Sequence, residues 1–273
     1  MIDTITHVIS LDHPGLEPYR TLKRPAEHRK RGIFIVEGKT VVDRFFESSL
    51  TALSILLAPE WFEQYEKRLE KRPEKMQVFV ADKKLLHTIV GFECHQGLMA
   101  LANVPSGSTI DEALKISPVP RIFVAVDHLV SAENTGVLIR NCAACGVQVL
   151  IVGETSSDPY LRRSVRNSMG TVFRLPVVYA EKLTDTLRDL RSRFGFSIFA
   201  AHPRPSSTPL PDADFSFNSC IVFGNEGDGI SDAVLAECDK AVAIPMAPGV
   251  DSFNVACASA VVLYEVMRQR DSR

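Results

Sequence analysis

The chain has 273 residues, of which 45% are hydrophobic, and a formal net charge of −2 at pH 7. These values are typical of one large or two modest globular domains, and the balanced charge excludes a global field that would attract a polyanion. Any surface that binds nucleic acid must therefore be local. The N-terminus lacks a basic start and a long apolar stretch, and no apolar run reaches the ~18 residues of a membrane span. We expect a cytoplasmic protein without membrane contact.

The first thirty residues are polar and hold a dense basic cluster. Its members are Arg20, Lys23, Arg24, Arg29, Lys30 and Arg31. Only Glu17 and Glu27 lie close by in the sequence. Two interpretations stay open, a solvated helix face and an arm that contacts the phosphates of a nucleic acid.

From Ile33 onward, short apolar runs alternate with amphipathic ones. The predicted strands are 33–36, 53–57, 77–80 and 97–102, and the predicted helices are 39–47, 59–71 and 82–90. This alternation indicates a small α/β domain over residues 1–105. Residues 106–120 are rich in Pro, Ser and Gly, which predicts a linker.

Residues 121–273 form the second predicted domain. Its predicted strands are 122–127, 147–152, 172–178, 196–201, 220–224 and 241–245. Its predicted helices are 134–145, 181–193, 231–238 and 252–269, with a basic segment at 160–169. The run IFVAVD at 122–127 is continuously apolar, as in a strand buried on both faces of a parallel sheet. The fold class is therefore α/β, with a mostly parallel, doubly wound sheet.

Six cysteines are scattered through these elements, which predicts reduced thiols rather than a disulfide framework. They are Cys94, Cys142, Cys145, Cys220, Cys238 and Cys257. Cys142 and Cys145 form the one CxxC, in the predicted last helical turn before Gly146. A redox pair is expected at a helix N-terminus, and a zinc site needs a second ligand pair nearby. We interpret the pair as small buried helix residues and expect no metal.

Three segments pass from an apolar strand through a polar loop into a helix. They read ENTGVLIR at 133–140, IVFGNEGDGIS at 221–231 and IPMAPGVDSFNVACASAVVLY at 244–264. In an α/β sheet, ligands bind at this edge. The second segment fails the Walker pattern because Ile230 follows Gly229, and it fails GxGxxG because Asp232 stands at the third glycine. Phosphoryl and hydride transfer are therefore disfavoured.

The apolar residues of these loops indicate a flat slot with free backbone groups, which suits an adenine ring. Gly224, Ile244, Met246 and Phe253 provide it, although ordinary strand-end packing is the alternative. Arg140 is either a solvated helix residue or an anion ligand, since its helix begins at the ligand edge.

The same segments resemble, in order, the three motifs of the SpoU/TrmH family of RNA ribose 2′-O-methyltransferases, in the SPOUT superfamily. FIVEG at 34–38 and HQGLMALA at 95–102 resemble the family's substrate-binding domain, which is similar to a ribosomal protein (L30e-like). The resemblance covers about residues 20–269. It implies a C-terminal trefoil knot, a homodimer, S-adenosylmethionine as methyl donor, and structured RNA as substrate, either rRNA or tRNA.

The resemblance also implies roles for individual residues. Catalytic roles fall to Asn134, Arg140, Glu226, Ser252 and Asn254. Cofactor binding falls to Gly224, Glu226, Ile244, Met246, Phe253 and Asn254. The third motif departs from the family pattern, with Pro248 and Phe253 at positions where glycine and leucine are usual.

Arg140 either accepts the proton of the ribose hydroxyl or clamps a phosphate while water or that phosphate takes the proton, because arginine is an awkward base. Two clusters are predicted to hold RNA phosphates: the six residues from Arg20 to Arg31, and Arg162, Arg163 and Arg166. Rival interpretations are an antibiotic-resistance rRNA methylase of the same family, a non-enzymatic RNA-binding protein of the same fold, and a Rossmann-type nucleotide enzyme.

Overall fold

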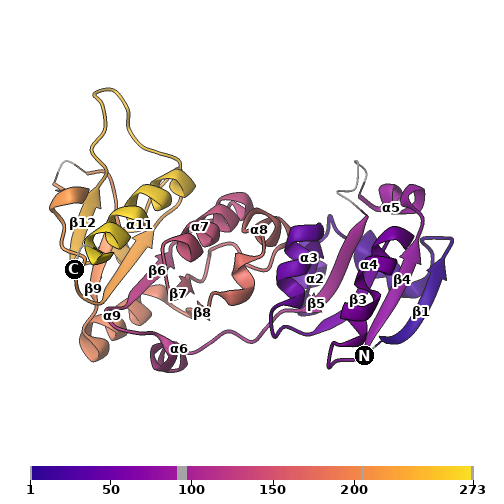
Figure 1. Ribbon diagram of the computed structural model, residues 1–273. Helices are drawn as coiled ribbons and strands as arrows, with labels where there is room; N and C mark the ends of the chain where they lie inside the picture. The colour runs from indigo at the N-terminus through magenta and orange to yellow at the C-terminus, as the bar shows by residue number, and fades with distance from the viewer. Residues whose placement is uncertain (1, 91–96, 205, 272–273) are drawn as a thin grey trace. The chain divides into compact units, whose positions relative to one another are not determined.

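The computed structural model describes residues 2–90, 97–204 and 206–271 (Figure 1). The chain divides into two compact units. The first contains Met1–Pro105 and Tyr160–Phe173, and the second contains Ser106–Pro159 and Arg174–Arg273. Cys94 and part of HQGLMALA lie outside the described residues.

The first unit is built on a five-stranded mixed sheet of order β1-β4-β3-β5-β2. Its strands are β1 (Ile2–Val8), β2 (Ile33–Glu37), β3 (Ala52–Leu57), β4 (Met76–Ala81) and β5 (Leu98–Asn103). Strands β1, β4 and β3 run parallel, whereas β5 is antiparallel to both β3 and β2. The helices are α1 (Glu17–Arg20), α2 (Pro25–Lys30), α3 (Lys39–Phe46), α4 (Pro59–Glu70), α5 (Lys83–Val90) and α8 (Arg162–Asn167), with a 3-10 turn η1 (Pro14–Leu16).

Strand β1 was not predicted, because the first residues show no clear alternation of apolar and polar side chains. Val8 is its one fully buried residue, and Ile5 is exposed. The strand pairs along one side with β4 and forms the edge of the sheet. An edge strand with one buried side chain carries little periodic signal.

Residues 160–173 pack in the core of the first unit, although they lie within the predicted second domain. The ring of Phe34 on β2 lies 5.2 Å from that of Tyr160, and the ring of Phe45 on α3 lies 5.6 Å from that of Phe173. Arg44 donates to the carbonyl oxygen of Met169 at 2.7 Å. The segment therefore belongs to the first unit because it contacts residues that lie more than a hundred positions earlier in the chain.

The second unit is built on a seven-stranded sheet of order β10-β12-β9-β11-β6-β7-β8, and all its pairings are parallel. Its strands are β6 (Ile122–Val126), β7 (Val149–Val152), β8 (Val177–Tyr179), β9 (Ser197–Ala201), β10 (Thr208–Pro209), β11 (Ser219–Phe223) and β12 (Lys240–Ala243). The helices are α6 (Ile110–Ile116), α7 (Ala132–Ala144), α9 (Leu183–Phe194), α10 (Asp232–Leu235) and α11 (Val255–Asp271), with the 3-10 turn η3 (Leu210–Asp212). The predicted α/β class and parallel sheet are confirmed.

The central strands of this sheet are buried, as their continuous apolar sequences predicted. Every residue of β6, β7 and β11 is buried. One face packs against side chains of α6, α9 and α10, whereas α7 and α11 contact each other. Residues 106–120 therefore include more than a linker: Thr109 forms a capping box with Glu112, and Ala113 of α6 enters the core.

Two predicted elements differ from the structure, and the sequence explains the first of them. Residues 172–178 belong to the 3-10 turn η2 (Thr171–Arg174) and the short strand β8 rather than to one strand, because Pro176 has no amide to donate to a ladder. The last helix begins at Val255 instead of 252. Ser252 to Asn254 therefore lie in the loop that precedes it.

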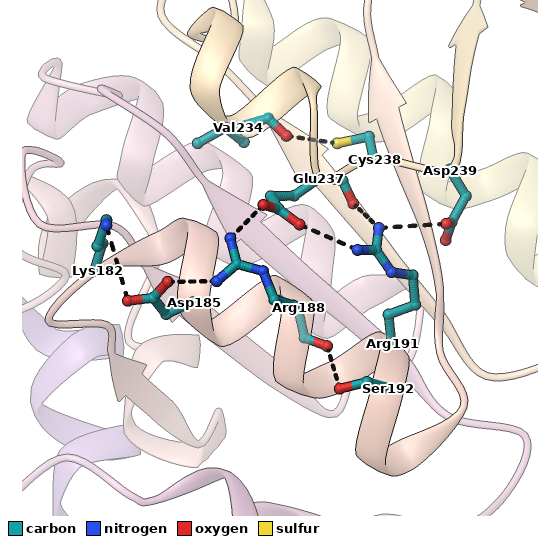
Figure 2. A network of polar contacts seen from close by, with 9 residues as sticks. All are labelled: Lys182, Asp185, Arg188, Arg191, Ser192, Val234, Glu237, Cys238 and Asp239. Atoms are coloured by element: carbon teal, nitrogen blue, oxygen red, sulfur yellow. Dashed lines mark hydrogen bonds and ion pairs between the residues drawn. The ribbon is translucent and has the colours of Figure 1, made fainter.

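Hydrogen bonds and ion pairs connect helix α9 to the segment that precedes β12 (Figure 2). Glu237 accepts from Arg188 at 2.5 Å and from Arg191 at 3.1 Å, and its own carbonyl accepts from Arg191 at 2.9 Å. Asp239 forms an ion pair with Arg191 at 3.6 Å and accepts a hydrogen bond from the backbone amide of Ile198 at 2.8 Å. These contacts fix the start of β12 beside β9, and hence the position of the carboxyl ends of both strands.

Across the described ranges, no helix is long and apolar enough to cross a membrane. Within the same residues, no group of three or more His, Cys, Asp or Glu side chains is placed to hold a metal ion. Five cysteines in the described part are free thiols. Burial raises the pKa of the Cys142 thiol and of the Cys145 thiol, the opposite of what a reactive CxxC pair requires.

Candidate functional site

A pocket of about 210 Å³ lies at the carboxyl ends of β9, β11 and β12 in the second unit. Three stretches that are distant in sequence line it. The first two are residues 201–203 and 223–229, and the third contributes Val242, Ala243, Ile244, Met246, Ser252, Phe253, Val255, Ala258 and Val262. Parallel strands bring these segments to one edge of the sheet, and two of them overlap the predicted segments 221–231 and 244–264.

The loop after β11 is held in a tight shape by its own backbone. Asn225 and Gly229 exchange two hydrogen bonds, of 2.8 Å and 3.1 Å, and the side-chain oxygen of Asn225 accepts the amide of Gly227 at 2.7 Å. Gly229 has a φ of +73°, which favours glycine. The loop therefore closes on itself at the mouth of the pocket.

Gly224 is required by this closure. A Cβ atom at position 224 would lie 2.3 Å from the carbonyl carbon and oxygen of Gly229, and 2.4 Å from the amide nitrogen of Ile230. Both distances are far inside van der Waals contact, and the atoms met are backbone atoms. Any side chain here would force the loop open.

The opposite wall is formed by the end of β12 and the loop before α11. Ile244, Met246 and Phe253, which the sequence suggested for a cofactor slot, line the pocket together with Ser252, to which the resemblance gave a catalytic role. Phe253 is 47% exposed although its ring is apolar. A flat ligand in the pocket would cover part of that apolar surface.

The loop before α11 also touches the start of α7. Asn254 donates from its amide nitrogen to the side-chain oxygen of Asn134 at 3.4 Å, and its own oxygen accepts the amide of Ala256 at 2.9 Å. Further along α7, Asn141 donates to the carbonyl oxygen of Ala256 at 2.7 Å and to Ser259 Oγ at 2.9 Å. The first and third predicted motifs thus meet through asparagine side chains.

Arg140 and Glu226 are both exposed, and they stand in different places relative to the pocket. Glu226 belongs to the loop that lines it, whereas Arg140 lies on α7 and is not among the lining residues. Of the predicted catalytic residues, the chain therefore groups Glu226 and Ser252 around one pocket, and joins Asn134 to Asn254 beside it. Arg140 is presented to solvent.

A model of the SpoU rRNA methylase family matches residues 121–264. The chain belongs to this family. It is therefore an RNA methyltransferase of the SpoU type, and the pocket lies inside the matched part of the chain.

Relatives of this SpoU chain cover nearly its full length. An uncharacterized tRNA/rRNA methyltransferase of Mycobacterium avium is 30% identical over 266 residues, which span 95% of this chain and 85% of that protein. One from Mycobacterium bovis is 29% identical over 277 residues, spanning 97% and 92%.

Two solved structures are similar in fold. The AdoMet-bound rRNA methyltransferase from Sinorhizobium meliloti has a TM-score of 0.83 and 25% identity, with 97% of this chain and 98% of that chain covered. The SpoU methyltransferase AviRb from Streptomyces viridochromogenes, in complex with the cofactor AdoMet, has a TM-score of 0.80 and 25% identity, with 94% and 100% covered.

The predicted basic clusters of this SpoU protein both fall in its first unit. Residues 20–31 contain the last residue of α1, a turn and the whole of α2, and Leu16, Tyr19 and Leu22 in and beside this stretch are core residues. Arg31 pairs with Glu17 and Arg24 with Glu27. The six basic residues themselves are exposed.

The second cluster divides into two kinds of residue. Arg162 pairs with the buried carboxylate of Glu37 at 2.5 Å, which ties α8 to the end of β2. Arg163 and Arg166 are exposed on α8. We assign Arg162 to packing, and the other two remain a predicted RNA-binding pair.

Sequence reasoning did not select four residues that shape the pocket. Asn225 closes the loop, His202 follows β9 and lines the pocket, and Asp127 with His128 follows β6. Burial lowers the pKa of the His202 imidazole below its ordinary value of 6.5, with Arg204 acting in the same direction. Their position in the sequence could have identified them, because all four residues lie at or directly after the carboxyl end of a predicted parallel strand.

Proposed function

We propose that this protein transfers a methyl group from S-adenosylmethionine to a ribose 2′-hydroxyl of structured RNA. Ribosomal RNA is the first substrate to test and transfer RNA the second. The observation that carries the proposal is the pocket in which the second and third motifs meet at one sheet edge, with the first motif joined to it through Asn134 and Asn254.

The reaction places modest demands on the protein. The carbon–sulfur bond of the sulfonium breaks as the methyl carbon bonds to the 2′-oxygen, which leaves a neutral thioether and releases the hydroxyl proton. The sulfonium already makes the methyl group electrophilic. Orientation of the two reactants and a route for the proton are therefore the main tasks.

We assign Arg140 the role of phosphate clamp. Its guanidinium lies in solvent and, within the described part of the chain, forms no hydrogen bond or ion pair. A guanidinium group offers several N–H donors that suit a phosphate, and it is a poor general base. In this scheme water or the clamped RNA phosphate accepts the hydroxyl proton, and Glu226, Ser252 and Asn254 orient the cofactor and the ribose.

We further propose that the functional unit is a homodimer with the trefoil knot of the family. Helix α11 presents Cys257, Val261 and Tyr264 to solvent at spacings of four and three residues, and the last two are 41% and 57% exposed. Such an apolar stripe suits burial against a second copy. Val261→Glu combined with Tyr264→Glu should shift the mass measured by light scattering from two chains to one.

Cofactor affinity gives the first test of the function. Calorimetric titration should detect S-adenosylmethionine binding and no comparable binding of NAD or ATP. Failure to bind S-adenosylmethionine, with the protein folded, would refute the proposal.

The acceptor atom gives the second test. Ribosomal and transfer RNA should be incubated with protein and cofactor labelled in the methyl group, and the labelled nucleotide mapped. A transcript with a 2′-deoxy nucleotide at that position should accept no methyl group. Undiminished labelling of the deoxy transcript would place the methyl group on a base instead.

A further inference from the structure

Asp127 is a buried carboxylate directly after β6, and its two oxygens have different partners. Its exposed fraction is 4%. One oxygen accepts the amide of Ser231 at 2.8 Å, and the other lies 2.8 Å from Nδ1 of His128. Its own amide donates to the carbonyl oxygen of Phe223, at the end of β11, at 2.9 Å. The residue therefore bridges the ends of two neighbouring strands.

His128 reaches the same loop through its backbone. The side-chain amide of Asn225 donates to the carbonyl oxygen of His128 at 2.8 Å. His128 has a φ of +53°, in the left-handed region that residues other than glycine seldom adopt. This conformation aims the carbonyl oxygen at Asn225 while the ring stays beside Asp127. The imidazole is half-exposed, so burial does not account for the strain.

Together the two residues hold both ends of the loop that lines the pocket. Asn225 begins the loop and is held by His128, whereas Ser231 ends it and is held by Asp127. Neither Asp127 nor His128 lines the pocket itself. We propose that Asp127 and His128 are positioning residues that keep the 224–231 loop in its cofactor-binding shape. This inference rests on the proposed function, because it takes S-adenosylmethionine as the ligand.

The consequence for binding follows from the hydrogen bonds. Removing the charged acceptor of the Ser231 amide should weaken S-adenosylmethionine binding by roughly tenfold to hundredfold, since the loop then samples open shapes. Asp127→Ala should show this loss. Asp127→Asn should recover most of the affinity, because its oxygen can accept from Ser231 while its amide nitrogen donates to the other tautomer of His128.

Glu37 supplies a matched control. It is also a carboxylate with 4% exposure at the carboxyl end of a strand, but its partner is Arg162 in the first unit. Glu37→Ala should lower the midpoint of thermal unfolding as Asp127→Ala does, and leave the cofactor affinity within about threefold of the wild type. Equal losses of affinity in the two variants would mean that global destabilisation, and not loop shape, is responsible, which would overturn the proposal.

The backbone role of His128 is tested by a second pair. His128→Gly permits the same positive φ and keeps the carbonyl oxygen, so affinity should stay within about threefold. His128→Val disfavours that φ because its side chain is β-branched, and should bind the cofactor more weakly than His128→Gly by about tenfold or more. Equal affinities of the two variants would contradict the backbone role.

Amide exchange gives a readout that needs no ligand. The Ser231 amide should be protected in the wild-type protein and in Asp127→Asn, and should exchange faster in Asp127→Ala. Unchanged protection in Asp127→Ala would refute the positioning role by itself. Faster exchange in a protein that never binds S-adenosylmethionine would instead leave the loop anchor standing and refute the proposed function.

Discussion

The two sheets of this protein differ in strand direction, and that difference determines where the loops that follow the strands gather. All seven strands of the second sheet run parallel, so the ends of β9, β11 and β12 gather their loops at one edge, where the pocket lies. The first sheet mixes directions, with β5 antiparallel to both neighbours. Its notable surface features are basic side chains on short helices.

This comparison predicts a division of labour. Substitutions at the edge of the parallel sheet should affect the cofactor and the chemistry, and substitutions on the helices of the first unit should affect RNA affinity. Each of the following experiments would break that division if its effect appeared in the other property.

Gly224→Ala should have the largest effect. The new Cβ atom would meet backbone atoms of Gly229 at 2.3 Å, and the loop must open to relieve the overlap. We expect S-adenosylmethionine affinity to fall by more than about hundredfold, equivalent to ~2.7 kcal/mol. Gly146→Ala is a useful control, since a Cβ atom there meets nothing within 4 Å, although its φ of +71° adds local strain. If Gly224→Ala retained its cofactor affinity, the close packing of residue 224 against the backbone of Gly229 would not be needed for cofactor binding.

Arg140→Ala should lower turnover by more than about tenfold, a barrier increase above ~1.4 kcal/mol, while cofactor affinity stays within a few-fold. Arg140 is exposed and does not line the pocket, so its loss should be felt by RNA and not by the cofactor. Single-turnover kinetics and calorimetry measure the two properties separately. A variant that turns over at more than a tenth of the wild-type rate would remove Arg140 from the essential residues.

Joint replacement of Arg20, Arg24 and Lys30 by glutamine should weaken RNA binding and flatten its salt dependence. Each lost phosphate contact should reduce the slope of log K against log salt by roughly one unit. Arg162→Met serves as the contrast, because Arg162 is paired with Glu37 inside the first unit, and it should lower stability more than the salt slope. An unchanged slope in the triple variant would show that residues 20–31 are only a solvated surface.

The smallest effect concerns pH. Burial lowers the pKa of the His28 imidazole below its ordinary value of 6.5, and its Nε2 lies 2.9 Å from Thr21 Oγ1. Because the folded pKa is depressed, the stability that the neutral ring provides is present above pH 6.5 and is lost as pH falls through the folded pKa. His28→Gln should flatten the acid side of the stability curve, whose slope for one proton is at most about 1.4 kcal/mol per pH unit. Urea unfolding at several pH values between 5 and 7.5 would measure it, and cofactor binding should not follow the same curve.

Much of the second unit could be predicted because its strands are buried on both faces. Continuous apolar runs as short as 122–127 and 220–224 are typical of strands in the middle of a parallel sheet, and the polar loops after them mark the ligand edge. Gly224, Ile244, Met246 and Phe253 were selected on this basis, Ser252 was selected from the family resemblance, and all five line one pocket in the structure. Their individual roles stay predictions.

The remainder depends on contacts between residues far apart in the chain. The pairing of Arg162 with Glu37 joins positions 125 residues apart, so the local sequence placed Arg162 with Arg163 and Arg166 in one predicted RNA-binding cluster. Asp127 was predicted as the last residue of strand 122–127, and its contact with Ser231 becomes visible only in the folded chain. Strand β1 is formed by pairing with β4 and has no periodic pattern of its own.

The return of residues 160–173 to the first unit has a consequence for how the protein is made. Tyr160 and Phe173 complete the aromatic cluster around Phe34 and Phe45. The cluster therefore cannot pack fully until the ribosome has synthesised those two residues. Ribosomes add about 5–20 residues per second, and a first domain usually folds while the next is being synthesised. Here the first unit must wait, with part of its core open, until the chain has grown past Phe173 and the first strands of the second sheet have already emerged.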